Sequence, residues 1–140
     1  MSTRARIGLE LPSGHVVSVY HHWDGYPQWL GKRLVEKYDT VDKIKKLIDG
    51  GDISSIDSNS SWDRMDLDEN IVLYYRDRGD ENVDPELHDD VVEYLEYAND
   101  QGCEYAYIFA NGEWRYFEVP GDMINEPKGE HLITFTPSPN

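Results

Sequence analysis

The stretch RARIGLELPSGHVVSVYHH, residues 4–22, decides the fold prediction because it contains two strands and the turn that joins them. Pro12 suits the first position of a turn, and Gly14 suits the left-handed third position of a three-residue hairpin loop. We therefore expect residues 4–11 and 15–22 to form a β-hairpin. The register that this turn predicts gives one apolar face for the core, made by the pairs Leu11–His15, Leu9–Val17 and Ile7–Val19.

The same register places polar side chains on the opposite face of the hairpin. Its pairs are Glu10–Val16, Gly8–Ser18, Arg6–Tyr20 and Arg4–His22. Guanidinium groups with a stacking aromatic ring suit an anionic, planar ligand such as a nucleotide. On this hypothesis Gly8 lets the ligand approach the backbone, and Trp23 or Tyr26 acts as a lid.

Residues 20–27, YHHWDGYP, bring together two histidines, a carboxylate and three aromatic side chains, the highest density of potential functional groups in the chain. A purely structural interpretation stays open, in which this segment is a hydrophobic strand-to-helix corner and Asp24 bonds backbone amides. Arg76 is equally open, since it either balances nearby acids or joins the anion site from a neighbouring strand. The predicted ligand-binding residues are Arg4, Arg6, Tyr20, His22, Trp23, Asp24, Tyr26 and Arg76.

Catalysis and metal binding have little support in the sequence. The chain has no GxSxG, Walker, HExxH or dinucleotide-binding motif. His21 and His22 are metal-ligand types, but adjacent strand residues point to opposite faces. Cys103 follows a predicted helix end, where the helix dipole raises a thiol pKa. We therefore predict no catalytic residue, no metal and no cofactor.

The remaining segments predict an α+β fold with a mainly antiparallel sheet, built from two hairpins plus further strands and packed by about three helices. Asn111-Gly112 is a strong two-residue turn signal and predicts the second hairpin. Its aromatic face is interpreted either as core or as a binding platform. The expected domain spans 1–136, and 137–140 is a tail. The other expected elements are helices at 27–38, 41–49 and 85–101 and strands at 71–76 and 131–136.

Charge is distributed unevenly along the 140 residues, whose net charge is −15. Residues 1–50 hold eight bases and six acids, whereas residues 51–140 hold five bases and 22 acids. Such a chain repels nucleic-acid phosphate, so direct DNA or RNA binding is not expected. The acidic half indicates either a highly soluble surface or a surface for a basic partner, including imitation of DNA.

The sequence also indicates where the protein works. It contains no apolar run of about 18 residues and no apolar signal segment, and a single cysteine excludes an internal disulfide framework. We therefore expect a cytoplasmic protein that does not enter the membrane.

Several motifs together resemble a small family of mostly uncharacterised proteins from tailed bacteriophages and their bacterial hosts. They are STRARIG near the N-terminus, YHHWDGYP, YYRDRG and EYAYIFANGEW. The resemblance covers most of the chain, and WDGYP is its most distinctive part. It implies a setting, a small accessory protein in an infected bacterial cytoplasm that acts in host takeover or anti-defence, rather than a reaction.

Three functions are therefore weighed. The first is a non-catalytic module that sequesters a nucleotide-like anion at the first hairpin. The second is an acidic inhibitor that binds a basic host protein or imitates DNA. The third is a small metal-assisted hydrolase with His22 and Asp24 as an acid–base pair. Homodimerisation stays open because both faces of the second hairpin are apolar.

Overall fold

The first hairpin forms with the predicted register. The computed structural model describes residues 3–56, 72–76, 79–119 and 131–132. Strands β1 (Ala5–Glu10) and β2 (Val16–His21) pair antiparallel, with Leu9 opposite Val17 and Ile7 opposite Val19. In the turn, the Leu11 amide donates to the His15 carbonyl and the Gly14 amide donates to the Leu11 carbonyl, and Gly14 adopts a φ of 93°. The turn chemistry therefore predicted the strand pairing correctly.

The second hairpin also forms as predicted. Strands β6 (Tyr105–Ala110) and β7 (Glu113–Glu118) are joined by Asn111-Gly112, with φ values of 54° and 80°. Phe109 lies opposite Trp114, and both are buried, as is Tyr107. The aromatic face of this hairpin is therefore core and not a binding platform.

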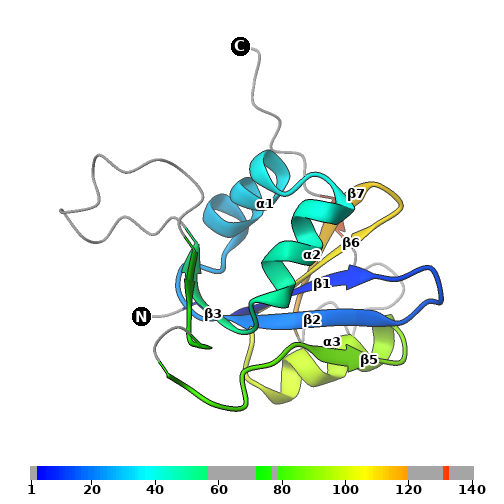
Figure 1. Cartoon of the computed structure of the whole chain (residues 1–140). Helices are drawn as coiled ribbons and strands as arrows, with labels where there is room; N and C mark the ends of the chain where they lie inside the picture. Colours follow the sequence, from blue (N-terminus) through cyan, green and yellow to red (C-terminus); the bar gives the residue numbers. More distant parts are fainter. Residues whose placement is uncertain (1–2, 57–71, 77–78, 120–130, 133–140) are drawn as a thin grey trace, which may run out of the picture.

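Pairing between distant segments joins the two hairpins into one mixed sheet (Figure 1). Its order is β4-β3-β2-β1-β6-β7-β8, with β5 also paired to β2. The central contact, β1 to β6, is parallel, as is β2 to β3, and the other pairs are antiparallel. The fold is α+β with a mostly antiparallel sheet, as predicted. The further strands are β3 (Ile53–Ile56), β4 (Val72–Tyr74), β5 (Glu86–His88) and β8 (His131–Leu132).

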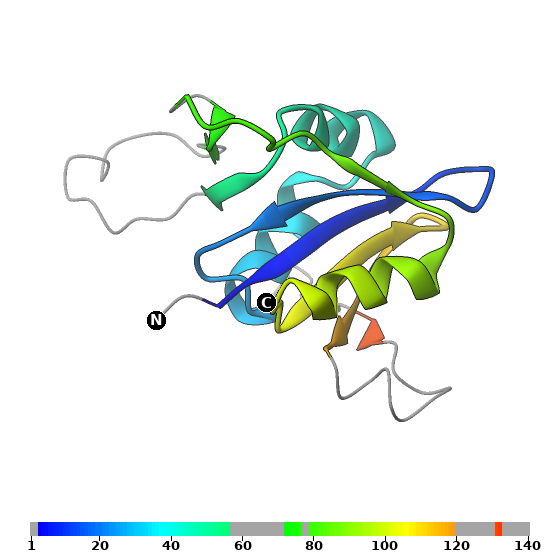
Figure 2. The same cartoon turned by 90° about the horizontal axis from the view of Figure 1, so that it is seen from below.

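Helices cover both faces of this sheet (Figure 2). One face carries the π-helical turn η1 (Pro27–Gly31), α1 (Lys32–Lys37) and α2 (Val41–Asp49). Thr40 caps α2 by accepting a hydrogen bond from the Lys43 amide at 3.2 Å. The predicted helix 27–38 is present, but its first turn is π-helical. Leucine and isoleucine side chains of these helices fill the core with β1 and β2: Leu30, Leu34, Ile44, Leu47 and Ile48.

The opposite face carries α3 (Val91–Asp100), which corrects the predicted helix at 85–101. The first part of that segment is strand β5, and Leu87 is 61% exposed instead of packed on a helical stripe. The helix begins at a capping box: Asp90 accepts from the Glu93 amide, and the Glu93 carboxylate accepts from the Asp89 amide. The capping residues at 89–93, and not Pro85, therefore mark the start of α3.

None of the helices in the described part of the chain is long and apolar enough to span a bilayer.

Candidate functional site

Helix α3 covers the hairpin face on which the arginine site was predicted. Arg6 is only 1% exposed, and its guanidinium lies 4.8 Å from the centre of the Tyr97 ring. Its Nε donates to Ser18 Oγ at 2.9 Å, and its other nitrogens donate to the Ser18 carbonyl and the Gln101 side chain. The donors of Arg6 are therefore engaged inside the protein, and its burial does not fit the expected exposed ligand face.

Gly8 serves packing rather than ligand approach, which corrects the hypothesis made from the sequence. A Cβ on Gly8 would lie 2.9 Å from Tyr94 Cζ and 3.0 Å from Val16 Cγ1. Tyr94 is fully buried and donates its hydroxyl to the Tyr107 carbonyl at 2.6 Å. The missing side chain at Gly8 thus makes room for α3.

The outer edge of β2 is shared by two strands, an arrangement we call the β2 fork. Strand β5 pairs with Val16 to Ser18, while β3 pairs with His21. Between them, the Tyr20 amide donates to Asp52 Oδ1 at 2.9 Å. Burial raises the pKa of Asp52, while this amide and the charge of Arg6 oppose the rise. The fork therefore places a carboxylate near the buried guanidinium.

His88 completes the polar network under α3. Its Nε2 lies 2.8 Å from Ser18 Oγ, and its ring contacts the rings of Tyr94 and Tyr97. Burial and the nearby Arg6 charge lower the pKa of His88. Ser18 is 0% exposed, so this serine–histidine contact has no access for a substrate and supports packing instead.

Three predicted residues do lie together at the end of β2. The Tyr20 hydroxyl is 2.7 Å from His22 Nδ1, and the His22 ring meets the Trp23 ring edge-on at 4.8 Å. Burial raises the pKa of Tyr20 to about 12, and the charge of nearby Arg4 opposes that rise. Trp23 is 43% exposed, so this cluster reaches the surface.

Asp24 and Tyr26 directly follow this cluster in the chain, whereas Arg76 comes from the segment after β4. Asp24 occupies the strand-to-helix corner with a φ of 57°, and Tyr26 precedes η1. Arg76 donates to Asp84 at 2.6 Å and to the Asp49 carbonyl at 3.1 Å. Arg76 therefore balances the charge of an acid, as one of the two interpretations expected. That acid is Asp84, which lies eight residues further along the chain.

Two buried titratable groups lie away from any described cavity. His21 is 0% exposed, both ring nitrogens lack hydrogen-bond partners, and burial lowers its pKa to about 3. Burial also raises the pKa of Cys103 to about 11, which leaves its thiol protonated and a poor nucleophile. The sequence correctly predicted a raised pKa for Cys103. The main cause is burial of the thiol rather than the helix dipole.

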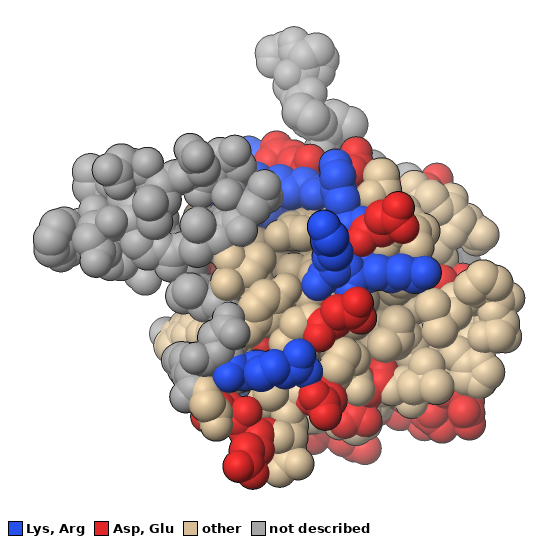
Figure 3. Space-filling model, viewed as in Figure 1, with Lys and Arg blue, Asp and Glu red and all other residues tan. Residues whose placement is uncertain are grey.

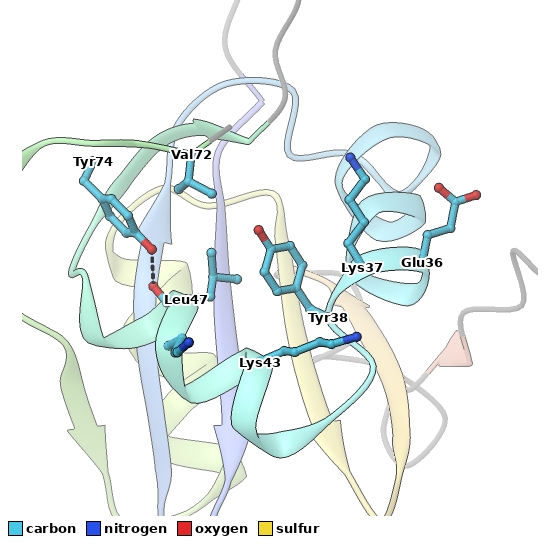
Figure 4. Close-up of a pocket in the computed structure, with 8 residues that line it drawn as sticks. Glu36, Lys37, Tyr38, Lys43, Leu47, Val72 and Tyr74 are labelled. Carbon is cyan, nitrogen blue, oxygen red and sulfur yellow. Dashed lines mark hydrogen bonds between the residues drawn. The ribbon is translucent and has the colours of Figure 1, made fainter. Parts of the chain in front are cut away.

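A cavity that the described residues show lies between α1, α2 and β4, and we call it the α1–α2 pocket (Figure 4). Its volume is about 460 Å³, within the usual range for small-molecule sites. Lysines from both helices border it, and aliphatic and aromatic side chains form its other walls. The lining residues are Glu36, Lys37, Tyr38, Lys43, Lys46, Leu47, Val72 and Tyr74.

Local sequence explains how α2 presents its lysines to this pocket. Lys43 and Lys46 are three positions apart and share one side of the helix, while Ile44, Leu47 and Ile48 face the core. Lys43 also forms an ion pair with Asp39 at 3.1 Å on the surface. Lys45 points to the other side of α2, where it lines a second cavity of about 430 Å³ near Pro12 and Asn111.

The two helical layers differ in charge, and Figure 3 shows the face that carries α1 and α2. Residues 32–46 contain six of the 13 basic residues, and blue side chains gather over α1 and α2. Residues 86–100 contain six acids and no lysine or arginine, and they form strand β5, which pairs with β2, and helix α3 on the opposite face of the sheet. A chain that is strongly acidic overall therefore carries its pocket on its most basic face.

The sequence analysis missed this pocket. The lysines of 32–46 were counted only in the charge balance, although the spacing of Lys43 and Lys46 was a readable signal. The pocket depends on β4 lying beside α2, and no local pattern predicts that contact. Within the described ranges, no group of three or more histidine, cysteine, aspartate or glutamate side chains could hold a metal ion.

Comparisons with protein-family models, with curated proteins and with solved structures find no match to this chain. The resemblance to bacteriophage proteins therefore stays an expectation, and the function must come from the geometry described above.

Proposed function

We propose that this protein is a non-catalytic binding module that holds a small anionic molecule in the α1–α2 pocket. The observation that carries the proposal is a cavity of about 460 Å³ bordered by three lysines, in a chain whose net charge is −15. This keeps the ligand class that the sequence favoured and moves the site from the first hairpin to the opposite face of the sheet.

The contrast in charge gives the pocket its selectivity. An anion is repelled by most of an acidic surface, and charges within a few ångströms of the ligand decide where it settles. Lys37, Lys43 and Lys46 supply three ammonium groups, against the carboxylate of Glu36 in the lining and that of Asp39, which pairs with Lys43 at 3.1 Å.

Isothermal titration calorimetry at low ionic strength tests the proposal, with pyrophosphate and ribose 5-phosphate as probes. We expect a Kd below about 1 mM for at least one probe. Lys46→Gln should weaken binding roughly 5-fold, because a hydrogen-bonded charge is lost.

Lys45→Gln is the matched control, since it removes the same charge from the same helix outside the α1–α2 pocket. It should change the Kd less than about 2-fold, as expected for a charge screened by solvent. An equal loss in both variants, or no binding of either probe, would contradict the proposed function.

The acidic side of the molecule favours a second candidate, an inhibitor that covers a basic protein surface. Its exposed acids on and before α3 are Glu86, Asp89, Asp90, Glu93, Glu96 and Asp100. If this surface imitates DNA, the protein should displace labelled duplex DNA from a basic DNA-binding protein at low salt. The double variant E96K/D100K should lose that competition, whereas Lys46→Gln should keep it. Competition that is unaffected by the double variant would exclude this role.

A further inference from the structure

The α1–α2 pocket has two chemically different sides. Figure 4 shows Lys37 and Lys43 on the side of the helices, while Tyr74 and Val72 reach in from β4 and Leu47 lies between them. A ligand that consists only of charged groups would leave the apolar side in contact with water. A ligand that fills the pocket needs an anionic part and a flat or apolar part.

Tyr74 is held in a fixed orientation at this apolar side. Its hydroxyl donates to the Leu47 carbonyl at 2.9 Å. A Cβ added to Gly50 would lie 2.3 Å from Tyr74 Cε1 and Cζ, so the ring packs directly on the Gly50 backbone. Because the ring is already ordered, a ligand that contacts it does not have to immobilise it.

We propose that the anion is a nucleoside phosphate, with its phosphate at Lys43 and Lys46 and its base against Tyr74. This inference rests on the proposed function and specifies the ligand of the same pocket. Lysine ammonium groups bind phosphate oxygens, and every nucleobase has a flat face that stacks on aromatic rings. A sugar phosphate would use the lysines but not the tyrosine.

Calorimetric titration with adenosine 5′-monophosphate, uridine 5′-monophosphate and ribose 5-phosphate at one ionic strength tests the inference. Stacking on an aromatic side chain predicts that both nucleotides bind roughly 10-fold tighter than ribose 5-phosphate. Adenosine, which lacks the phosphate, should bind more weakly than adenosine 5′-monophosphate.

Two variants then locate the base. Tyr74→Leu should lower the affinity for adenosine 5′-monophosphate to that for ribose 5-phosphate, while Tyr74→Phe keeps the ring and the preference. Gly50→Ala should act like Tyr74→Leu, because its methyl group displaces the ring. Gly50 has a φ of −72°, which alanine adopts without strain, so this variant perturbs the ring rather than the backbone.

The outcomes separate the two proposals. Equal affinities for the nucleotides and ribose 5-phosphate would overturn the nucleoside inference and leave anion binding standing. A nucleotide preference that survives both Tyr74→Leu and Gly50→Ala would also overturn it. Failure of all the phosphates to bind would overturn the proposed function as well.

Discussion

Arg6 beneath α3 and the lysines of the α1–α2 pocket carry the same charge in opposite surroundings. Arg6 is 1% exposed, and its nitrogens donate to Ser18 and Gln101. Lys43 and Lys46 stand on an exposed helix face beside a cavity. The protein itself supplies the acceptors of Arg6, so this cation belongs to the fold, whereas the two lysines lie beside the space that the proposed ligand would occupy.

The sharpest test of this contrast is Arg6→Ala. The variant removes the hydrogen bonds of Arg6 to Ser18 and Gln101 and creates a void under α3, so we expect the free energy of unfolding to fall by about 3 kcal/mol. Urea unfolding followed by circular dichroism measures the loss. Arg4→Ala, at an exposed arginine two residues earlier, should change stability by less than about 0.5 kcal/mol. Similar effects in the two variants would break the comparison.

His21 extends the comparison to a buried base without partners. Its pKa is about 3 in the folded protein and 6.5 ordinarily, so only the unfolded state gains a proton as the pH falls below 6.5. The free energy of unfolding should therefore drop by about 2 kcal/mol between pH 7 and pH 5, and the loss should continue toward pH 3.

The control for this pH effect is His21→Leu, measured by urea unfolding at pH 7 and pH 5. The variant should lose most of the pH dependence, although His88, whose pKa is also lowered, retains a part with the same sign. It should be at least as stable as the parent at pH 7, because leucine leaves no unpaired buried nitrogen. An unchanged pH dependence would show that His21 is not the group responsible.

Gly8→Ala tests how tightly α3 closes over the arginine side of the sheet. The new methyl group would lie 2.9 Å from Tyr94 Cζ, and the hydroxyl of Tyr94 is fixed to Tyr107. Overpacking of this kind should lower the free energy of unfolding by about 1.5 kcal/mol, as measured by chemical denaturation. A stabilised variant would mean that α3 packs more loosely than the structure shows.

The smallest expected effect belongs to the lysine side. Lys46→Ala removes an exposed side chain that has no role in the core, so stability should change by less than about 0.5 kcal/mol. Thermal unfolding in the absence of ligand measures it. A loss comparable to that of Arg6→Ala would assign Lys46 to the fold and weaken its assignment to a ligand.

Local signals in the sequence predicted local structure well. The Pro12-Ser13-Gly14 and Asn111-Gly112 turns fixed both hairpin registers, and Thr40 marked the start of α2. The parallel contact of β1 with β6 and the packing of α3 on the hairpin join segments about 80 to 100 residues apart. Turn chemistry and periodicity contain no information about such contacts.

The candidate site shows the same limit. The register correctly placed Arg6 opposite Tyr20, yet whether that face meets solvent depended on where α3 docks. The capping box of Asp90 and Glu93 could have placed the start of α3, but not the face that it covers. The α1–α2 pocket needed the position of β4 as well. The sequence places its lysines on α2, but the cavity beside them depends on tertiary packing.

The β2 fork protects one edge of β2 against aggregation through strand addition. Exposed strand edges are templates on which other chains add strands and aggregate. Here β5 and β3 occupy the two halves of the outer edge of β2, and the Asp52 carboxylate binds the Tyr20 amide between them. The His22 and Trp23 amides donate to Ile53 and Ser54. An incoming strand would therefore find this edge already paired, and a half-buried carboxylate occupies the position between the two strands.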